Sequence, residues 1–282
     1  MLNIIRMDLY RMFKSKTTWI VLAAAMLMMF ASVFMTHSDI VYYMNNSTAL
    51  ANLKLNYDPV NWGIYIGSVS PDWCTGAEIP IWGIYALNIR SKILLMFLVV
   101  FTVIFVNGES RTGFIKNIAG QVQNRGALVL SKLIAVAVFS VMLLLSTLLV
   151  IILSCQVFFG YVNFSNIGNF MPYLATQFLL HISFGAVMIC LIVLLRNTVA
   201  SMLVGILVSS GILQIVDTII GALLHGIKGN FSIMYYITSG NIAALSMNSG
   251  TGDYIRALLV GLIFLVCTSG ISMAITQTRD VD

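Results

Sequence analysis

A long run without a single charge is the feature that most constrains this chain. Residues 133–195 contain no Asp, Glu, Lys or Arg. Such a run cannot form a water-exposed surface, and about 20 mainly apolar residues suffice to cross the hydrocarbon core of a bilayer. The run is too long for one crossing, and the Asn, Gly and Pro residues within 155–172 break it in the middle. It therefore predicts a helical hairpin, 133–154 and 173–195.

The composition of the whole chain extends this conclusion. Hydrophobic residues make up 59% of the 282 residues and charged residues only 9%, whereas soluble domains carry about 25% charged residues. The excess of Lys and Arg, 15 against 10 acidic residues, comes with no basic patch on a soluble fold, so we expect no nucleic-acid partner. The prediction is an all-α integral membrane protein.

The remaining apolar runs complete a plan of six transmembrane helices. They predict spans at 18–36, 89–106, 199–222 and 256–276. The first run is too long for a signal-peptide core and has no clear cleavage site after it, so we expect a retained span. Segments 37–88 and 223–254 then lie outside and 107–132 inside.

Basic residues set the orientation, because cytoplasmic loops are rich in Lys and Arg. Ten of the fifteen fall in the termini, the 107–132 loop and the turn at 196: Arg6, Arg11, Lys14, Lys16, Arg111, Lys116, Arg125, Lys132, Arg196 and Arg279. Both termini are therefore expected in the cytoplasm. Arg90 and Lys92 lie at the outer start of the second span, where they either reach the external headgroups or line an aqueous vestibule.

The N-terminal segment 2–16 has the pattern of an amphipathic helix. Apolar and polar residues fall on different faces at helical spacing. The apolar face holds Leu2, Ile5, Leu9, Met12 and Phe13, and the polar face holds Asn3, Asp8, Arg11 and Lys14. A basic amphipathic helix before a span is expected to lie in the membrane interface; the alternative is a disordered positive flank that only sets the topology.

Sequence motifs for catalysis are missing. The chain has no G-x-x-x-x-G-K-[ST], no H-E-x-x-H and no G-x-S-x-G, and its three histidines are far apart. An enzyme is therefore not expected, and neither is a cofactor or metal in this chain. Cys74 and Cys155 either form a disulfide outside the membrane or remain thiols.

Two pairs of polar residues interrupt the predicted spans. Gln177 and His181 lie four residues apart on one helical face, and Gln214 and Asp217 lie three apart. Ionisable groups inside a membrane usually face the bundle interior or water. These four residues could line a substrate path in the outer third, or they could form interhelical hydrogen bonds.

The charged segment 107–132, "NGESRTGFIKNIAGQVQNRGALVLSK", lies between the second and third predicted spans. Phe114, Ile115 and Ile118 share one side of a short helix bracketed by Gly113 and Gly120. The segment is either a solvated linker that sets the topology or a helix that fits a groove on a partner protein.

This segment resembles the first cytoplasmic loop of ABC-2-type transporter permeases. The matching residues are Glu109, Gly113, Lys116, Asn117, Arg125 and Lys132. Residues 8–19, "DLYRMFKSKTTW", resemble the interfacial elbow helix of that family. The resemblance implies an elbow helix at 2–16 with the residues Arg6, Leu9, Arg11, Met12 and Lys14. The ending "RDV" at 279–281 resembles the branch that includes bacteriocin-immunity and bacitracin-resistance permeases.

The resemblance implies a coupling helix that docks on a separate ATP-binding subunit. The implied coupling residues are Glu109, Arg111, Gly113, Phe114, Ile115, Lys116, Asn117, Ile118 and Arg125. ATP and Mg²⁺ would bind the partner, and a second permease copy or a homologous permease would complete the complex. The resemblance also implies a re-entrant helical pair within 231–247, between the fifth and sixth spans, for which an ordinary folded external loop is the alternative.

Function follows from the same resemblance. We expect an exporter in a bacterial plasma membrane that moves an amphipathic substrate, such as an antimicrobial peptide, an antibiotic or a lipid. The alternatives are a membrane sensor or scaffold whose external loop 37–88 binds a ligand, and a stand-alone secondary transporter. The latter would need charged or broken helices at the midplane and internal repeats, and the sequence predicts neither.

Overall fold

The computed structural model describes residues 1–58, 60–111, 125–165, 167–228 and 232–278, with only the backbone at 109–111 and 223–228. The longer helices are α1 (Leu2–Lys14), α2 (Lys16–Asn45), α3 (Ser47–Asn56), α4 (Ile81–Arg90), α5 (Ile93–Arg111), α7 (Gly126–Phe158), α8 (Phe170–Leu195), α9 (Thr198–Ser209), α10 (Leu213–Lys228), α11 (Thr238–Ala244) and α12 (Thr251–Thr278). Three short 3-10 helices are η1 (Pro71–Thr75), η2 (Ile167–Asn169) and η3 (Ile233–Tyr236). Within these described ranges the regular elements are helices, as predicted.

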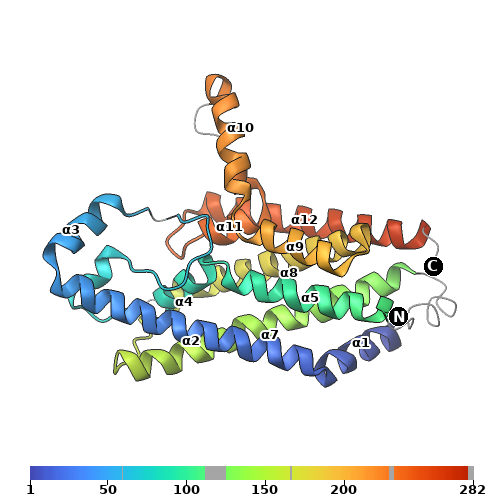
Figure 1. Cartoon of the computed structure of the whole chain (residues 1–282), viewed down its shortest axis with the longest axis horizontal. Helices are drawn as coiled ribbons and strands as arrows, with labels where there is room; N and C mark the ends of the chain where they lie inside the picture. Colours follow the sequence, from blue (N-terminus) through green and yellow to red (C-terminus); the bar gives the residue numbers. More distant parts are fainter. Residues whose placement is uncertain (59, 112–124, 166, 229–231, 279–282) are drawn as a thin grey trace.

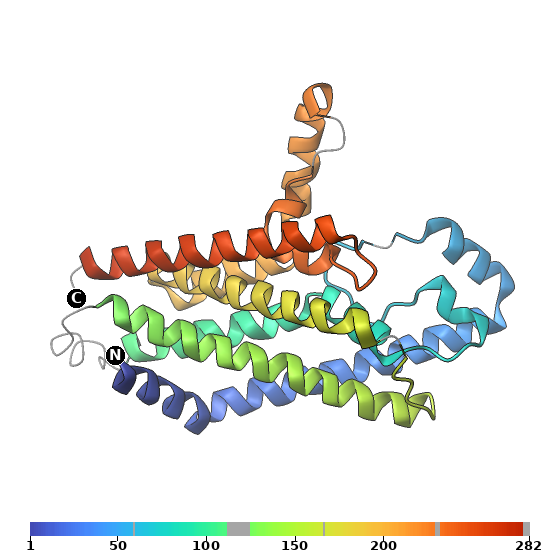
Figure 2. The same ribbon diagram turned by 180° about the vertical axis from the view of Figure 1, so that it is seen from behind.

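The long helices form an elongated bundle (Figures 1 and 2). The start of α1 and the end of α12 lie at one end of it, which we call the terminal end; α3 lies at the other, the distal end. Among the described residues, four helical segments are long and apolar enough to cross a membrane: α2, α7, residues 167–195 and α12. The number rises to six if each of two bent helix pairs is counted as one span. The fold class, an all-α multi-pass membrane protein, is confirmed at this level.

Two bent pairs correct the prediction that the spans are unbroken. The pairs α4–α5 and α9–α10 each bend by 55°. The expected span 89–106 therefore starts in α4 and is divided at Lys92, which has a positive φ of 59°. The expected span 199–222 is divided at Gly211, with φ 85°. A helix of 12 residues such as α9 rises only about 18 Å, so α9 alone is too short for a crossing.

Helical structure also extends into the predicted outer segments. The first long helix, α2, runs to Asn45 rather than ending at 36, and α3 and α4 occupy much of the expected loop 37–88. Helix α10 projects sideways from the bundle in both views. Within 231–247, the described part holds η3 and the short helix α11, whose residues are mostly buried.

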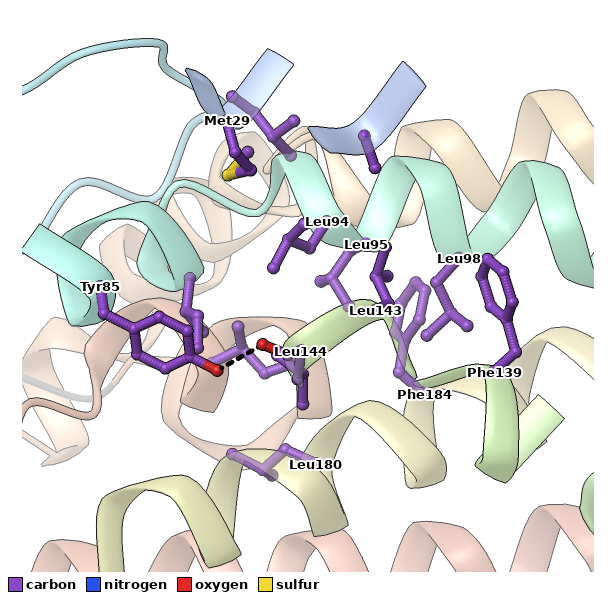
Figure 3. Packing of buried hydrophobic residues seen from close by; sticks show 14 of the residues in the cluster. Met29, Tyr85, Leu94, Leu95, Leu98, Phe139, Leu143, Leu144, Leu180 and Phe184 are labelled. Carbon is purple, nitrogen blue, oxygen red and sulfur yellow. Dashed lines mark hydrogen bonds between the residues drawn. The ribbon is translucent and has the colours of Figure 1, made fainter. Parts of the chain in front are cut away.

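The packed core surrounds α8, which contacts α5, α7, α9, α11 and α12. Apolar side chains interdigitate there (Figure 3), and the hydroxyl of Tyr85 donates to the carbonyl of Leu144 at 3.1 Å. Close approach of α9 depends on Gly205, where an added Cβ would lie 2.7 Å from Cγ1 of Val99 on α5. Small residues allow such contacts between membrane helices.

Candidate coupling site at the terminal end

Helix α1 is held as a separate element by the first turn of α2. The chain is extended at Ser15, with φ −71° and ψ 125°. The hydroxyl of Thr18 then donates to the carbonyl of Met12 at 2.7 Å, and the indole of Trp19 donates to the carbonyl of Phe13 at 2.9 Å. Because the last carbonyls of a helix lack partners within the helix, these bonds stabilise the end of α1 and fix the corner at Ser15.

A buried carboxylate joins α1 to α7. Asp8 is only 1% exposed, and the hydroxyl of Ser131 on α7 donates to its Oδ2 at 2.6 Å. Nζ of Lys132 lies 3.9 Å from Oδ2, and an Arg11 nitrogen lies 3.6 Å from Oδ1. These two separations are ion-pair contacts rather than hydrogen bonds. One acid therefore lies between two basic side chains, one from each helix.

Arg11 connects the same cluster to α5. Its guanidinium donates to the carbonyl of Phe105 at 3.1 Å and lies 4.3 Å from the centre of the Phe105 ring. Burial lowers the pKa of Arg11 from its usual value, and the negative charge of Asp8 partly opposes this effect. Asp8, Arg11, Phe105, Ser131 and Lys132, which we call the Asp8 cluster, thus tie together α1, α5 and α7.

The burial pattern of α1 shows which of its residues pack against the bundle. The helix exists over Leu2–Lys14, but its polar residue Asp8 is buried against the bundle, while Leu2 is 82% exposed and Phe13 44% exposed. Of the implied elbow residues, Met12 is buried, Leu9 and Arg11 are half-buried, and Arg6 and Lys14 are exposed. The helix binds the bundle through a charge cluster and Met12 rather than through its whole apolar face.

Most of the implied coupling residues lie outside the described part. These are Gly113, Phe114, Ile115, Lys116, Asn117 and Ile118. Glu109 and Arg111 belong to the last turn of α5, where only the backbone is described, and Arg125 is the residue before α7. What the structure shows is the base of the segment: it leaves α5 and enters α7, and the Asp8 cluster joins these two helices.

The four polar residues of the predicted substrate path fall into two separate groups. Gln177 and His181 are fully buried in α8; the Gln177 amide donates to the carbonyl of Ile242 on α11 at 3.4 Å, and a His181 ring nitrogen lies 2.7 Å from the Gln177 carbonyl. Gln177 thus makes an interhelical hydrogen bond, the second of the two interpretations above.

The other two residues lie on α10. Gln214 is exposed. Asp217 accepts hydrogen bonds from the hydroxyl of Ser232, at 2.9 Å, and from the backbone N–H of Ile233, at 2.5 Å. Asp217 therefore binds the segment that follows α10.

The next two observations concern the cysteines and metal binding. Cys74 and Cys155 are both buried thiols, so the disulfide alternative is wrong for this structure. In the described ranges, no three His, Cys, Asp or Glu residues are grouped so that they could hold a metal ion.

Sequence reasoning missed the Asp8 cluster, although one signal was present. Asp8 is the only acidic residue among the first 38, in a segment rich in Arg and Lys. A lone carboxylate there could have been paired with the basic residue that opens the third predicted span, Lys132. The role of Phe105 had no such signal, because it lies within an unbroken apolar run.

No protein-family model matches this chain, and no curated protein matches its sequence. The class of protein therefore rests on the long apolar helices alone, and its activity is a matter for proposal.

Proposed function

We propose that this chain is the permease subunit of an ATP-driven exporter of the ABC-2 type, with six spans and both termini in the cytoplasm. The observation that carries the proposal is the Asp8 cluster. It lies where the charged segment 107–132 leaves and re-enters the bundle, and it joins α1, α5 and α7. A displacement of that segment by a partner would therefore reach three helices together.

The physical argument concerns force transmission. A bundle with two arrangements needs an element through which an external energy source shifts the balance between them. The chain has no P-loop, so ATP would bind a separate subunit together with Mg²⁺. In this proposal Phe114, Ile115 and Ile118 enter a groove on that subunit, and Arg111 and Lys116 orient them. A second permease chain completes the exporter in a bacterial plasma membrane, and the substrate is amphipathic.

A transport assay with one altered residue tests this function. Ile115→Asp places a charge in the apolar stripe and should abolish efflux of a panel of amphipathic dyes and peptides from cells, while membrane insertion stays normal. Gln121→Asp adds the same charge elsewhere in the segment and should leave efflux unchanged. Efflux that survives Ile115→Asp would show that the segment is not the coupling element.

The two bent helix pairs favour a second candidate, a stand-alone secondary transporter. Broken helices are the usual substrate and ion sites of such proteins, and the structure has two of them. The two candidates differ in energy source. Export that collapses with the ion gradient while ATP is maintained supports the secondary transporter; export that follows ATP supports the permease.

The tryptophan contacts do not favour the alternative of a membrane sensor. Trp82 is buried and stacks on Phe170 at 4.2 Å, and Trp62 packs edge-on against Tyr235 at 5.3 Å. These outer tryptophans therefore serve packing within the molecule.

A further inference from the structure

The two helix breaks meet at one buried ammonium group. Lys92, at the α4–α5 break, is fully buried. Its Nζ donates to the carbonyl of Trp62, which lies in the outer segment, residues 60–70. At the α9–α10 break, an added Cβ on Gly211 would lie 3.1 Å from this Nζ and would overlap the same Trp62 carbonyl. Gly211 thus leaves the space in which the two breaks and the outer segment come together.

The ammonium of Lys92 can donate more hydrogen bonds than it makes in this structure. A lysine carries three donor hydrogens. Among the residues that the structure describes, Lys92 has one acceptor, the Trp62 carbonyl, and no carboxylate within ion-pair distance. A buried charge without an opposite charge is costly, and an ionisable group inside a membrane protein usually marks a functional site. Lys92 is therefore poised for an anion.

The surroundings of Lys92 add to the positive potential. Helix α5 begins at Ile93, directly after Lys92, and α10 begins two residues after Gly211. The N-terminal end of a helix carries partial positive charge and favours anions. Two further cations lie on neighbouring elements. Arg90 donates to the carbonyl of Ala243, and Arg256 lies 4.6 Å from the ring of Tyr235, which packs against Trp62.

Acidic residues balance this charge only in part. Asp253 pairs with Arg256 at 2.9 Å, and Asp217 is engaged by Ser232 and Ile233. Neither contacts Lys92. The outer segment that covers the ammonium, residues 60–70, forms no helix or strand and is held to α2 by side-chain bonds, from Gly67 N–H to Ser32 at 3.1 Å and from Ser68 N–H to Thr36 at 3.4 Å. Displacing this segment would therefore break side-chain contacts rather than a helix or a sheet.

We propose that Lys92 is the centre of an anion site that takes the phosphate group of an amphipathic lipid, and that the Trp62 carbonyl occupies the site in the closed structure. Lysine is a common phosphate ligand. Aromatic side chains beside the site, Trp62 and Tyr235, suit the boundary between headgroups and acyl chains. The proposal goes beyond export, because binding at Lys92 requires neither ATP nor a partner subunit.

The test uses the full chain in detergent and calorimetric titration with a short-chain phosphatidylglycerol. Lys92→Asn removes the charge and keeps a residue that tolerates positive φ; it should weaken binding at least tenfold. Lys54→Asn removes an exposed charge on α3 and should leave binding unchanged. Gly211→Ala places a methyl group 3.1 Å from Nζ, in the space that the Trp62 carbonyl fills and that the phosphate would take, and should also weaken binding. Gly160→Ala, at a glycine that also has a positive φ, should leave binding unchanged.

The outcomes separate clearly. Equal binding by wild type and Lys92→Asn overturns the site, and so does unchanged binding by Gly211→Ala; the latter result decides the matter even if Lys92→Asn fails to fold. Inorganic phosphate is titrated in parallel. If it binds as tightly as the lipid and with the same dependence on Lys92, the assignment to a lipid phosphate is wrong and the ligand is free phosphate. If it neither binds nor competes, the lipid assignment stands.

Discussion

The two ends of the bundle treat buried charge in opposite ways. At the terminal end, Asp8 lies between Arg11 and Lys132, so positive and negative side chains from two helices compensate each other. Toward the distal end, Lys92 is buried, and the Trp62 carbonyl is its one acceptor among the described residues. The terminal end is thus a closed network that joins three helices, whereas the distal contact depends on an irregular segment. We infer that the terminal end moves as a unit and that the distal end opens.

The largest effect is expected for Asp8→Ala. The change leaves two basic side chains without their counter-charge, and breaking a buried ion pair costs about 3–5 kcal/mol. The unfolding free energy in detergent, measured by denaturant titration, should fall by that order. Asp253→Ala breaks a half-exposed pair with Arg256 and should cost no more than about 1 kcal/mol. Equal losses for the two variants would contradict the difference between a network and a surface pair.

Gly211→Ala is expected to have the second-largest effect on stability, at the distal end. Its φ of 85° disfavours alanine by about 1–2 kcal/mol, and the new Cβ also overlaps the Trp62 carbonyl. Hydrogen exchange should rise in residues 60–70 while α1 and the start of α7 keep their protection.

Gly160→Ala is the matched control for this variant. Gly160 also has a positive φ, 74°, but no atom lies within 4 Å of an added Cβ. Gly160→Ala should therefore introduce the same backbone strain at a positive φ, but it should not release residues 60–70. If both variants release that segment equally, the contact between the two helix breaks does not hold it.

The smallest effect concerns the reactivity of Cys74 in the distal segment η1. Burial raises the pKa of this thiol, and Lys54 opposes the shift only in part. Because the thiolate is the reactive form, alkylation of the folded protein should be slower than that of a free thiol at neutral pH, with a pH profile displaced to higher pH. Mass spectrometry after unfolding without reductant should find Cys74 and Cys155 both free; a disulfide between them would contradict the structure.

Sequence reasoning predicted the parts of the fold that depend on apolar length. Residues 133–195 were predicted as a hairpin, and α7 and α8 form it, because a charge-free run has no alternative to burial or lipid. A separate helix before the first span was also predicted, and α1 is that helix. The breaks at Lys92 and Gly211 were not, because both lie inside or beside apolar runs and depend on tertiary contacts with Trp62.

The candidate site was predictable only in outline. The segment 107–132 was singled out by its charge, but the contacts that join its base to α1 depend on which face of α1 turns toward the bundle. Amphipathic spacing predicted a helix in the membrane interface and did not say which residues contact the bundle. The buried partners Ser131 and Lys132 turn Asp8, together with Met12, toward the bundle, and the pairing of Asp8 with Ser131 spans 123 residues of sequence.

The central claim is that the charged segment couples the bundle to an ATP-binding subunit. The most direct test is purification of the tagged protein from its native host in mild detergent, as wild type, Ile115→Asp and Gln121→Asp. An ATP-binding subunit should accompany wild type and Gln121→Asp and be lost from Ile115→Asp. If no ATP-binding protein accompanies the wild type, or if Ile115→Asp retains it fully, the account of the terminal end as a coupling site is wrong.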